Sequence, residues 1–264
     1  MTIDADRPIE DRYRIDAVET ALDLLTLVAE TPDLGLSEIA RRCGQNKTRA
    51  YRMLCSLESK GFVTFSPESR SYRLGMLALT VGNAAARQIE IARLAAPFLD
   101  RLGSETGETP QLRVLRGRES VCVAAWEPDR EIKVDPQLGE RRPLHAGSSI
   151  VLLAFMNEAD REEVLSAPLE RFTQRTCTDP DSLRAILARV REERLYLSYG
   201  EVSPDLMSIC VPVTAPDGKV LAALNLGAPA GRVTESLLSS YIEAVRKTAD
   251  ELARQLDGLP VTRG

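Results

Sequence analysis

Apolar residues recur every three to four positions in the first part of the chain, a spacing that predicts amphipathic helices. The first helix is expected over residues 15–30, because Pro32 follows and prevents its extension. A short second helix is expected after Ser37, whose hydroxyl can cap its N-terminus, and Gly44 suits the left-handed residue that ends it. A third helix is expected to run from about Asn46 or Lys47 to Ser59, with an apolar stripe formed by Ala50, Met53, Leu54 and Leu57.

Two short β-rich runs come next, at residues 62–65 and 71–74, and they flank the turn sequence Ser-Pro-Glu-Ser-Arg. Such a pair predicts a hairpin. Helix, helix, short turn, helix and hairpin is the element order of a winged helix-turn-helix. We therefore predict that domain over residues 15–75, with a flexible charged tail over residues 1–14 before it and a linker helix over residues 76–90 after it.

The remaining residues, 91–264, mix strand and helix patterns. Pro97 is expected to interrupt the helical pattern that continues to Gly103. Antiparallel pairs of strands are expected on either side of Arg-Gly-Arg and of Ala-Pro-Asp-Gly, and a further strand at 132–135. Helices are expected at 147–156, 160–165, 181–194 and 234–256. This mixture predicts an α+β domain built on an antiparallel sheet.

Composition narrows the class of protein. The chain is 44% hydrophobic and 28% charged, as globular proteins are. It has no apolar run of about 18 residues that would span a membrane, and its charged start lacks a signal-peptide core. We therefore expect a cytoplasmic protein that has no membrane partner. The five cysteines form no CxxC pair and His145 is the only histidine, so reduced thiols are expected and no metal site or cofactor.

Charge is unevenly distributed along the chain. Residues 41–73 contain eight basic and two acidic side chains, a net charge of +6, and since the whole chain carries −5 the other residues carry −11. A basic segment within an acidic chain is typical of a nucleic-acid module joined to another domain. A charged solvent-facing surface is the simpler alternative.

Several polar residues of the third predicted helix lie opposite its apolar stripe. Arginine can bridge O6 and N7 of guanine, and threonine can contact bases or phosphates, so the N-terminal half of this helix is expected to read the major groove. Lys47 is better placed for phosphate, and Arg70 at the hairpin tip for the backbone or minor groove. The expected DNA contacts are Lys47, Thr48, Arg49, Tyr51, Arg52, Ser56 and Arg70.

Three stretches of the first domain resemble the IclR family of bacterial transcriptional regulators: residues 35–44, residues 47–62 and Tyr-Arg-Leu-Gly at 72–75. So do Arg-Pro-Leu-His-Ala-Gly at 142–147, Val-Pro-Val at 211–213 and residues 218–224, so the resemblance runs from about residue 15 to 256. It implies a GAF-like effector domain, a homodimer or homotetramer, and operator affinity that responds to a small organic ligand, often a carboxylate or an aromatic catabolite.

The candidate ligand residues lie in the second domain. The turn before the helix predicted at 147–156 offers free N–H groups that suit an anion; a simple helix cap is the alternative. By family position Ser208 and Asn225 face the same pocket from adjacent strands, and Cys210 shares the face of Ser208. Trp126 can wall the pocket or fill the core, and we favour the core. The expected effector contacts are Ala146, Gly147, Ser148, Ser208, Cys210 and Asn225.

This sequence departs from the family at that site. Many members carry cysteine where Ser208 stands, and serines where Asn225 and Gly227 stand. The ligand is therefore expected to differ from the best-known ones, or the pocket to have lost its function. A ligand-independent regulator or a protein-interaction module is the alternative hypothesis. An enzyme is disfavoured, because no GxSxG, Walker, GxGxxG or HExxH motif occurs.

Overall fold

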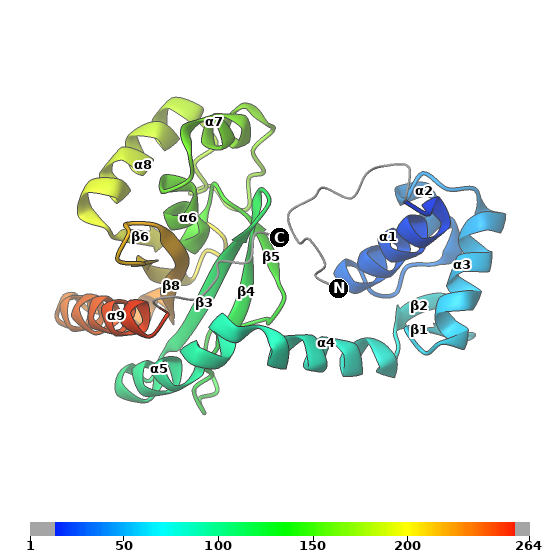
Figure 1. Cartoon of the computed structure of the whole chain (residues 1–264), viewed down its shortest axis with the longest axis horizontal. Helices are drawn as coiled ribbons and strands as arrows, with labels where there is room; N and C mark the ends of the chain where they lie inside the picture. The colour runs from blue at the N-terminus through cyan, green and yellow to red at the C-terminus, as the bar shows by residue number, and fades with distance from the viewer. Residues whose placement is uncertain (1–13, 257–264) are drawn as a thin grey trace, which may run out of the picture. The chain divides into compact units, whose positions relative to one another are not determined.

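Three helices and a two-stranded hairpin make up the first part of the chain (Figure 1). The helices are α1 (Asp16–Glu30), α2 (Leu36–Arg42) and α3 (Lys47–Ser59), and the strands are β1 (Val63–Ser66) and β2 (Ser71–Leu74). The strands pair antiparallel, so the predicted order of elements is confirmed. The computed structural model describes residues 14–256; the predicted tail lies outside these residues except for Arg14.

The apolar stripes of the three helices meet in one core. Leu24 of α1, Ile39 of α2 and Leu54 of α3 are fully buried there, and Val63 and Tyr72 close the core from the hairpin. Gly44, between α2 and α3, has a φ of 62°, the left-handed conformation predicted for it. One predicted detail is wrong: α2 begins at Leu36 with Gly35 as its N-cap, so Ser37 lies inside the first turn and caps nothing.

Helix α3 has the side-chain cap that α2 lacks. The Asn46 side chain accepts a 2.8 Å hydrogen bond from the backbone N–H of Arg49. We expect Asn46→Ala to lower the free energy of unfolding by about 1 kcal/mol, because that N–H then loses its partner. Faster amide exchange confined to α3 would confirm this. Asn157→Ala, which removes the matching cap of another helix, α7 (Glu158–Ser166), should leave exchange in α3 unchanged.

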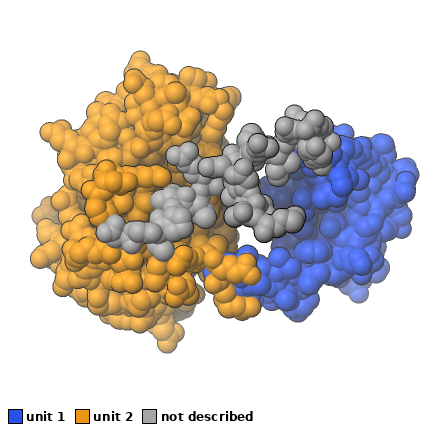
Figure 2. Space-filling model, viewed as in Figure 1, with its two compact units in different colours: residues 1–86 blue, residues 87–264 orange. Residues whose placement is uncertain are grey.

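The chain divides into two compact units, residues 1–86 and 87–264 (Figure 2). Helix α4 (Met76–Gln88) contains the division, and α5 (Glu90–Thr106) follows after a break at Ile89, whose backbone is extended. The predicted interruption at Pro97 is wrong, because α5 continues through it. Pro97 is exposed, so the carbonyl that its missing N–H leaves unpaired can be hydrated.

A six-stranded antiparallel sheet forms the centre of the second unit, with the order β5-β4-β3-β8-β7-β6. Both predicted strand pairs are present, and the α+β fold class is confirmed. The short edge strands β5 and β6 were not predicted, and residues 132–135, where a strand was expected, pair with no strand of the described part of the chain. The strands are β3 (Thr109–Arg116), β4 (Glu119–Ala125), β5 (Arg141–Pro143), β6 (Tyr196–Tyr199), β7 (Leu206–Thr214) and β8 (Val220–Pro229).

The two faces of this sheet have different characters. One face is apolar and packs against α5 and α9 (Glu235–Gln255). Trp126 packs against this core, as favoured. The other face is covered by α6 (Ile150–Ala154) and α8 (Pro180–Glu193), beside which lies α7 (Glu158–Ser166) (Figure 1). It carries polar side chains, and the candidate ligand site lies on it. None of the described helices is long and apolar enough to cross a bilayer.

Candidate nucleic-acid and ligand sites

The expected DNA-contacting residues of α3 are mostly on its solvent side. Lys47, Thr48, Arg52 and Ser56 are exposed, and Tyr51 is 52% exposed despite its size. The opposite side of the helix is anchored in the core by Ala50 and Leu54. The helical period therefore places these polar groups on one surface that a nucleic acid can approach.

Arg49 behaves differently from the other candidates on α3. Its guanidinium forms an ion pair with Asp16 of α1 and donates a 3.3 Å hydrogen bond to the hydroxyl of Thr20. Arg49 therefore ties α3 to α1 within the domain, and DNA contact would require the guanidinium to leave these partners. Asp16 lies outside the basic segment, so the local charge count could not reveal this pair.

Three other basic side chains of the segment are also neutralised by neighbours. Arg41 and Arg42 both donate to Glu38, and these bonds lower the pKa of the Glu38 carboxyl to about 2. Arg73 pairs with Asp33 in the same way. Within the described residues, the basic side chains of the segment that make no such pair are Lys47, Arg52, Lys60 and Arg70.

Arg70 stands at the turn of the hairpin. Its backbone φ is 52°, and its side chain is exposed. Left-handed backbone is uncommon for arginine, although a turn between antiparallel strands can require it. The position presents the guanidinium at the tip of the wing, where the sequence predicted it.

The expected ligand residues of the sheet share one face. Cys210 of β7 is paired with Asn225 of β8, and Tyr196 of β6 pairs with Cys210 from the other side. Directly paired residues point to the same face of a sheet, and residues two apart on a strand do so as well. Ser208, Cys210 and Asn225 therefore face the same side, and all three are buried.

The predicted turn lies against these same strands. Gly147–Ser149 forms the short 3-10 helix η2 ahead of α6, and η2 contacts β6, β7 and β8. Ala146, Gly147 and Ser148 are buried there. Gly147 has a φ of 63°, which favours glycine, and an added Cβ would lie 2.9 Å from Val202. The structure thus brings the two predicted groups of ligand residues together.

Sequence reasoning missed the acidic group of this site. The Glu201 carboxylate accepts a 2.9 Å hydrogen bond from the Gly147 N–H and a 2.6 Å bond from the Tyr196 hydroxyl. Burial raises the pKa of that hydroxyl, and the negative Glu201 raises it further. Burial also raises the pKa of the Cys210 thiol, again with a contribution from Glu201. Glu201 is 54 residues from Gly147 in the chain, and no spacing or motif signalled the contact.

Asn225 makes an incomplete set of hydrogen bonds. Its side chain is 3% exposed, and its amide nitrogen is 3.4 Å from the Gln111 side-chain oxygen on β3. Its Oδ1 atom has no hydrogen-bond partner among the residues that the structure describes. A buried acceptor without a donor is destabilising, and a hydrogen-bond donor from a ligand or a water molecule would relieve the cost.

A buried arginine on the neighbouring strand β3 lies on the same face of the sheet. Arg113 of β3 is fully buried and donates to the Ser120 hydroxyl, to the backbone oxygen of Glu140 and to the Glu140 carboxylate. Burial lowers its pKa. With these partners the guanidinium is a structural element of the sheet, and it supplies positive charge near Cys210.

Two segments pass over the polar face. Val134, in the segment expected to be a strand, accepts a hydrogen bond from the Thr109 hydroxyl, and its side chain faces Gly227. That segment therefore covers the sheet instead of extending it, and Ile132 is 68% exposed. The segment around Glu201 lies over Gly147.

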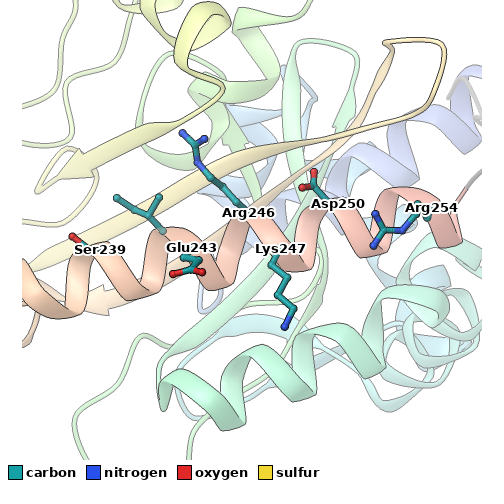
Figure 3. A pocket seen from close by; sticks show the side chains of 7 residues that line it. Ser239, Glu243, Arg246, Lys247, Asp250 and Arg254 are labelled. Carbon is teal, nitrogen blue, oxygen red and sulfur yellow. The ribbon is translucent and has the colours of Figure 1, made fainter.

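A surface hollow of about 540 Å³ lies elsewhere, along the exposed side of α9 (Figure 3). Its wall carries charges of both signs, including Glu243, Arg246 and Asp250. None of the expected ligand residues lines this hollow.

The described residues contain no cluster of three His, Cys, Asp or Glu side chains suited to a metal ion.

Comparisons with known proteins agree with both parts of the chain. Residues 17–67 match the family model described as the IclR helix-turn-helix domain, and residues 83–254 match that of the bacterial transcriptional regulator IclR C-terminal domain. The HTH-type transcriptional regulator BhcR of Paracoccus denitrificans (strain Pd 1222) is 32% identical over 246 residues, which are 92% of this chain and 88% of BhcR.

Solved structures give the same result. A putative IclR transcriptional regulator from Silicibacter sp. TM1040 has a TM-score of 0.77 and 31% identity, covering 92% of this chain and 98% of its own. An IclR homolog from Microbacterium hydrocarbonoxydans, solved as a complex with 4-hydroxybenzoate, has a TM-score of 0.72 and 26% identity over 91% of this chain and 98% of its own. The curated relatives are named as transcriptional regulators, so the prediction that the chain is not an enzyme is confirmed.

Proposed function

The chain belongs to the IclR family of bacterial transcriptional regulators, and from this we propose that it binds a double-stranded DNA operator with an affinity controlled by a small organic ligand. We assign DNA reading to residues 15–75, the linker helix to 76–90 and ligand binding to 91–264. The protein would act in the cytoplasm, where the operator is accessible.

The observation that carries DNA binding is the surface of α3. Lys47 and Arg52 are exposed and make no ion pair with the described residues, whereas Arg41, Arg42, Arg49 and Arg73 are held by acids. We propose Arg52 and Thr48 for base contacts, Lys47 for phosphate, and Arg70 for the backbone or minor groove. Tyr51 and Ser56 supply further contacts, and Arg49 contributes once it leaves Asp16.

The ligand is proposed to bind at the polar face of the sheet, between η2 and the strands. Gly147 N–H and Ser148 suit a carboxylate, and Ser208, Cys210 and Asn225 line the sheet side. The unpaired Oδ1 of Asn225 supports an occupant that also carries a hydrogen-bond donor, such as a hydroxyl. The Microbacterium homolog was solved with an aromatic carboxylate, 4-hydroxybenzoate. We therefore propose a carboxylate or an aromatic catabolite as the ligand of this chain.

A homodimer, or a tetramer made of two such dimers, is proposed as the DNA-binding form. One module contacts few bases, so specificity usually requires two half-sites. Helix α4 has no buried residue, and its apolar side chains Met76, Leu79 and Val81 are 75%, 58% and 48% exposed. A second copy of the chain would cover this apolar surface.

A ligand-independent regulator or a protein-interaction module is the second candidate. The observation in its favour is that Glu201 and Val202 already occupy the space at Gly147. In that case the affinity of the winged helix for its target would not change when small molecules are added.

DNA binding to the upstream intergenic region of the protein's own gene, at fixed salt, tests the proposal. Specific binding should change by about 5- to 150-fold when one member of a panel of carboxylic and aromatic acids is added. Specific binding that no acid changes would favour the ligand-independent regulator. Absence of specific binding at this region and at other candidate operators would favour the protein-interaction module.

A further inference from the structure

One carboxylate of the chain already occupies the donors of the proposed ligand site. The two oxygens of Glu201 take one hydrogen bond each, from the Gly147 N–H at 2.9 Å and from the Tyr196 hydroxyl at 2.6 Å. A carboxylate held by two donors is the arrangement by which proteins bind organic acids. Glu201 supplies this group from within the chain.

The position of Glu201 coincides with the polar face of the sheet. Tyr196, Cys210 and Asn225 form one row across β6, β7 and β8, and Glu201 bonds to the first of them. The third, Asn225, is 3% exposed with its Oδ1 atom unpartnered. One side chain of this row is therefore satisfied by an internal acid, while another still lacks a donor.

The backbone around Glu201 is fastened independently of its carboxylate. Thr176 donates a 2.7 Å bond to the Glu201 carbonyl, and Thr173 donates a 2.6 Å bond to the Gly200 carbonyl. Val202, the next residue, packs against Gly147. The carboxylate can thus leave its donors by side-chain rotation while the threonine bonds hold the segment in place.

An external carboxylate cannot use the same two donors while Glu201 holds them. Two carboxylates within hydrogen-bonding distance of the same groups repel each other, and this cost opposes binding. We propose that Glu201 is a built-in competitor of the effector: a ligand carboxylate binds by taking the Gly147 N–H and the Tyr196 hydroxyl from Glu201. The inference rests on the proposed function, because it concerns the same ligand site.

Displacement of Glu201 by a ligand would change the contacts within the second unit. Without ligand, Glu201 joins η2 to β6 through its two bonds; with ligand, that connection passes to the ligand and Glu201 is released. Ligand binding therefore breaks the connection that Glu201 makes between η2 and β6. A ligand can control affinity only if the contacts differ between the two states, and this exchange supplies such a difference. Only ligands that carry a carboxylate or a similar planar anion fit this exchange.

Chemical rescue tests the proposal in the full-length protein. Glu201→Ala leaves two donors without an acceptor, so acetate should bind in place of the lost side chain. Relative to equal sodium chloride, acetate should raise the Tm of this variant by about 2–4 °C, and it should not raise that of the unaltered protein. Adding Tyr196→Phe should reduce the rescue, because one donor is lost.

Two further variants complete the experiment. Asp205→Ala removes an exposed carboxyl from the same segment and should show no rescue by acetate. Glu201→Gln keeps the shape but not the charge, and serves if Glu201→Ala does not fold; acetate should bind it at least about fivefold more tightly than the unaltered protein. A Tm of Glu201→Ala that acetate and chloride affect equally, or equal acetate affinity of Glu201→Gln and the unaltered protein, would overturn the proposal. The Tm and the acetate affinity are measured without DNA. These results can therefore be interpreted even if the protein does not bind the tested operator.

Discussion

Replacing Arg232 with leucine is expected to lower the free energy of unfolding of the second unit by about 3 kcal/mol. Glu108, between α5 and β3, is fully buried, and both of its oxygens accept hydrogen bonds from Arg232, at 2.8 and 2.9 Å. Without Arg232, the buried Glu108 carboxylate has one remaining ion-pair partner among the described residues: Arg130, which is 3.5 Å away and 46% exposed. Removing one member of a buried pair is costly because the other charge remains desolvated.

Chemical denaturation of the variants measures this effect. Arg184→Leu is the matched control, because Arg184 pairs with Glu162 where both side chains are exposed, and its loss should leave the free energy of unfolding nearly unchanged. Adding Glu108→Gln to Arg232→Leu should restore part of the lost stability by removing the unpaired charge. Equal losses in Arg232→Leu and Arg184→Leu would contradict the burial argument.

Arg52→Ala is expected to weaken binding to a specific operator by about 1–3 kcal/mol, roughly 5- to 150-fold. Arg52 lies in the N-terminal half of α3, its side chain is exposed, and the core residues Ala50 and Leu54 on the other side of the helix are untouched by the change. The fold should therefore persist while one bidentate base contact is lost.

Titrations on operator and unrelated DNA at several salt concentrations separate this role from simple charge. Arg52→Ala should lower the ratio of specific to non-specific affinity. Lys47→Ala should weaken both kinds of binding alike and reduce the salt slope by about 1. Arg189→Ala, an exposed arginine of α8, should change neither. Unchanged operator affinity of Arg52→Ala would remove Arg52 from the proposed contacts.

The helices of the first unit could be predicted because their cause is local. The period of apolar residues, the left-handed Gly44 and the turn between the strands act over a few residues, so they are visible in the sequence. The errors have several causes, and one is local, because Ser37 lies in the first turn of α2 instead of capping it. Pro97 is tolerated inside α5 because tertiary packing leaves its side of the helix exposed, and β5 and β6 are too short to show an alternating pattern.

The candidate sites divide in the same way. Alternation along β7 predicted that Ser208 and Cys210 share a face, and the register with β8 adds Asn225 to it. The exposed residues of α3 follow from its helical period. The sequence did not show which basic side chains are held in ion pairs, because their partners Asp16, Asp33 and Glu38 lie outside residues 41–73.

The two-part organisation, the family and the exposed face of α3 followed from the sequence, which also predicted the residues that we propose for the ligand site. Only the tertiary structure decided that Arg49 is engaged by Asp16, that Glu108 is buried against Arg232, and that Glu201 occupies the donors at Gly147 and Tyr196. The physical reason is the distance along the chain. Periodicity and caps relate residues a few positions apart, whereas the contacts Arg49–Asp16, Arg232–Glu108 and Gly147–Glu201 join residues 33, 124 and 54 positions apart. Only the packed fold brings these groups within hydrogen-bonding distance.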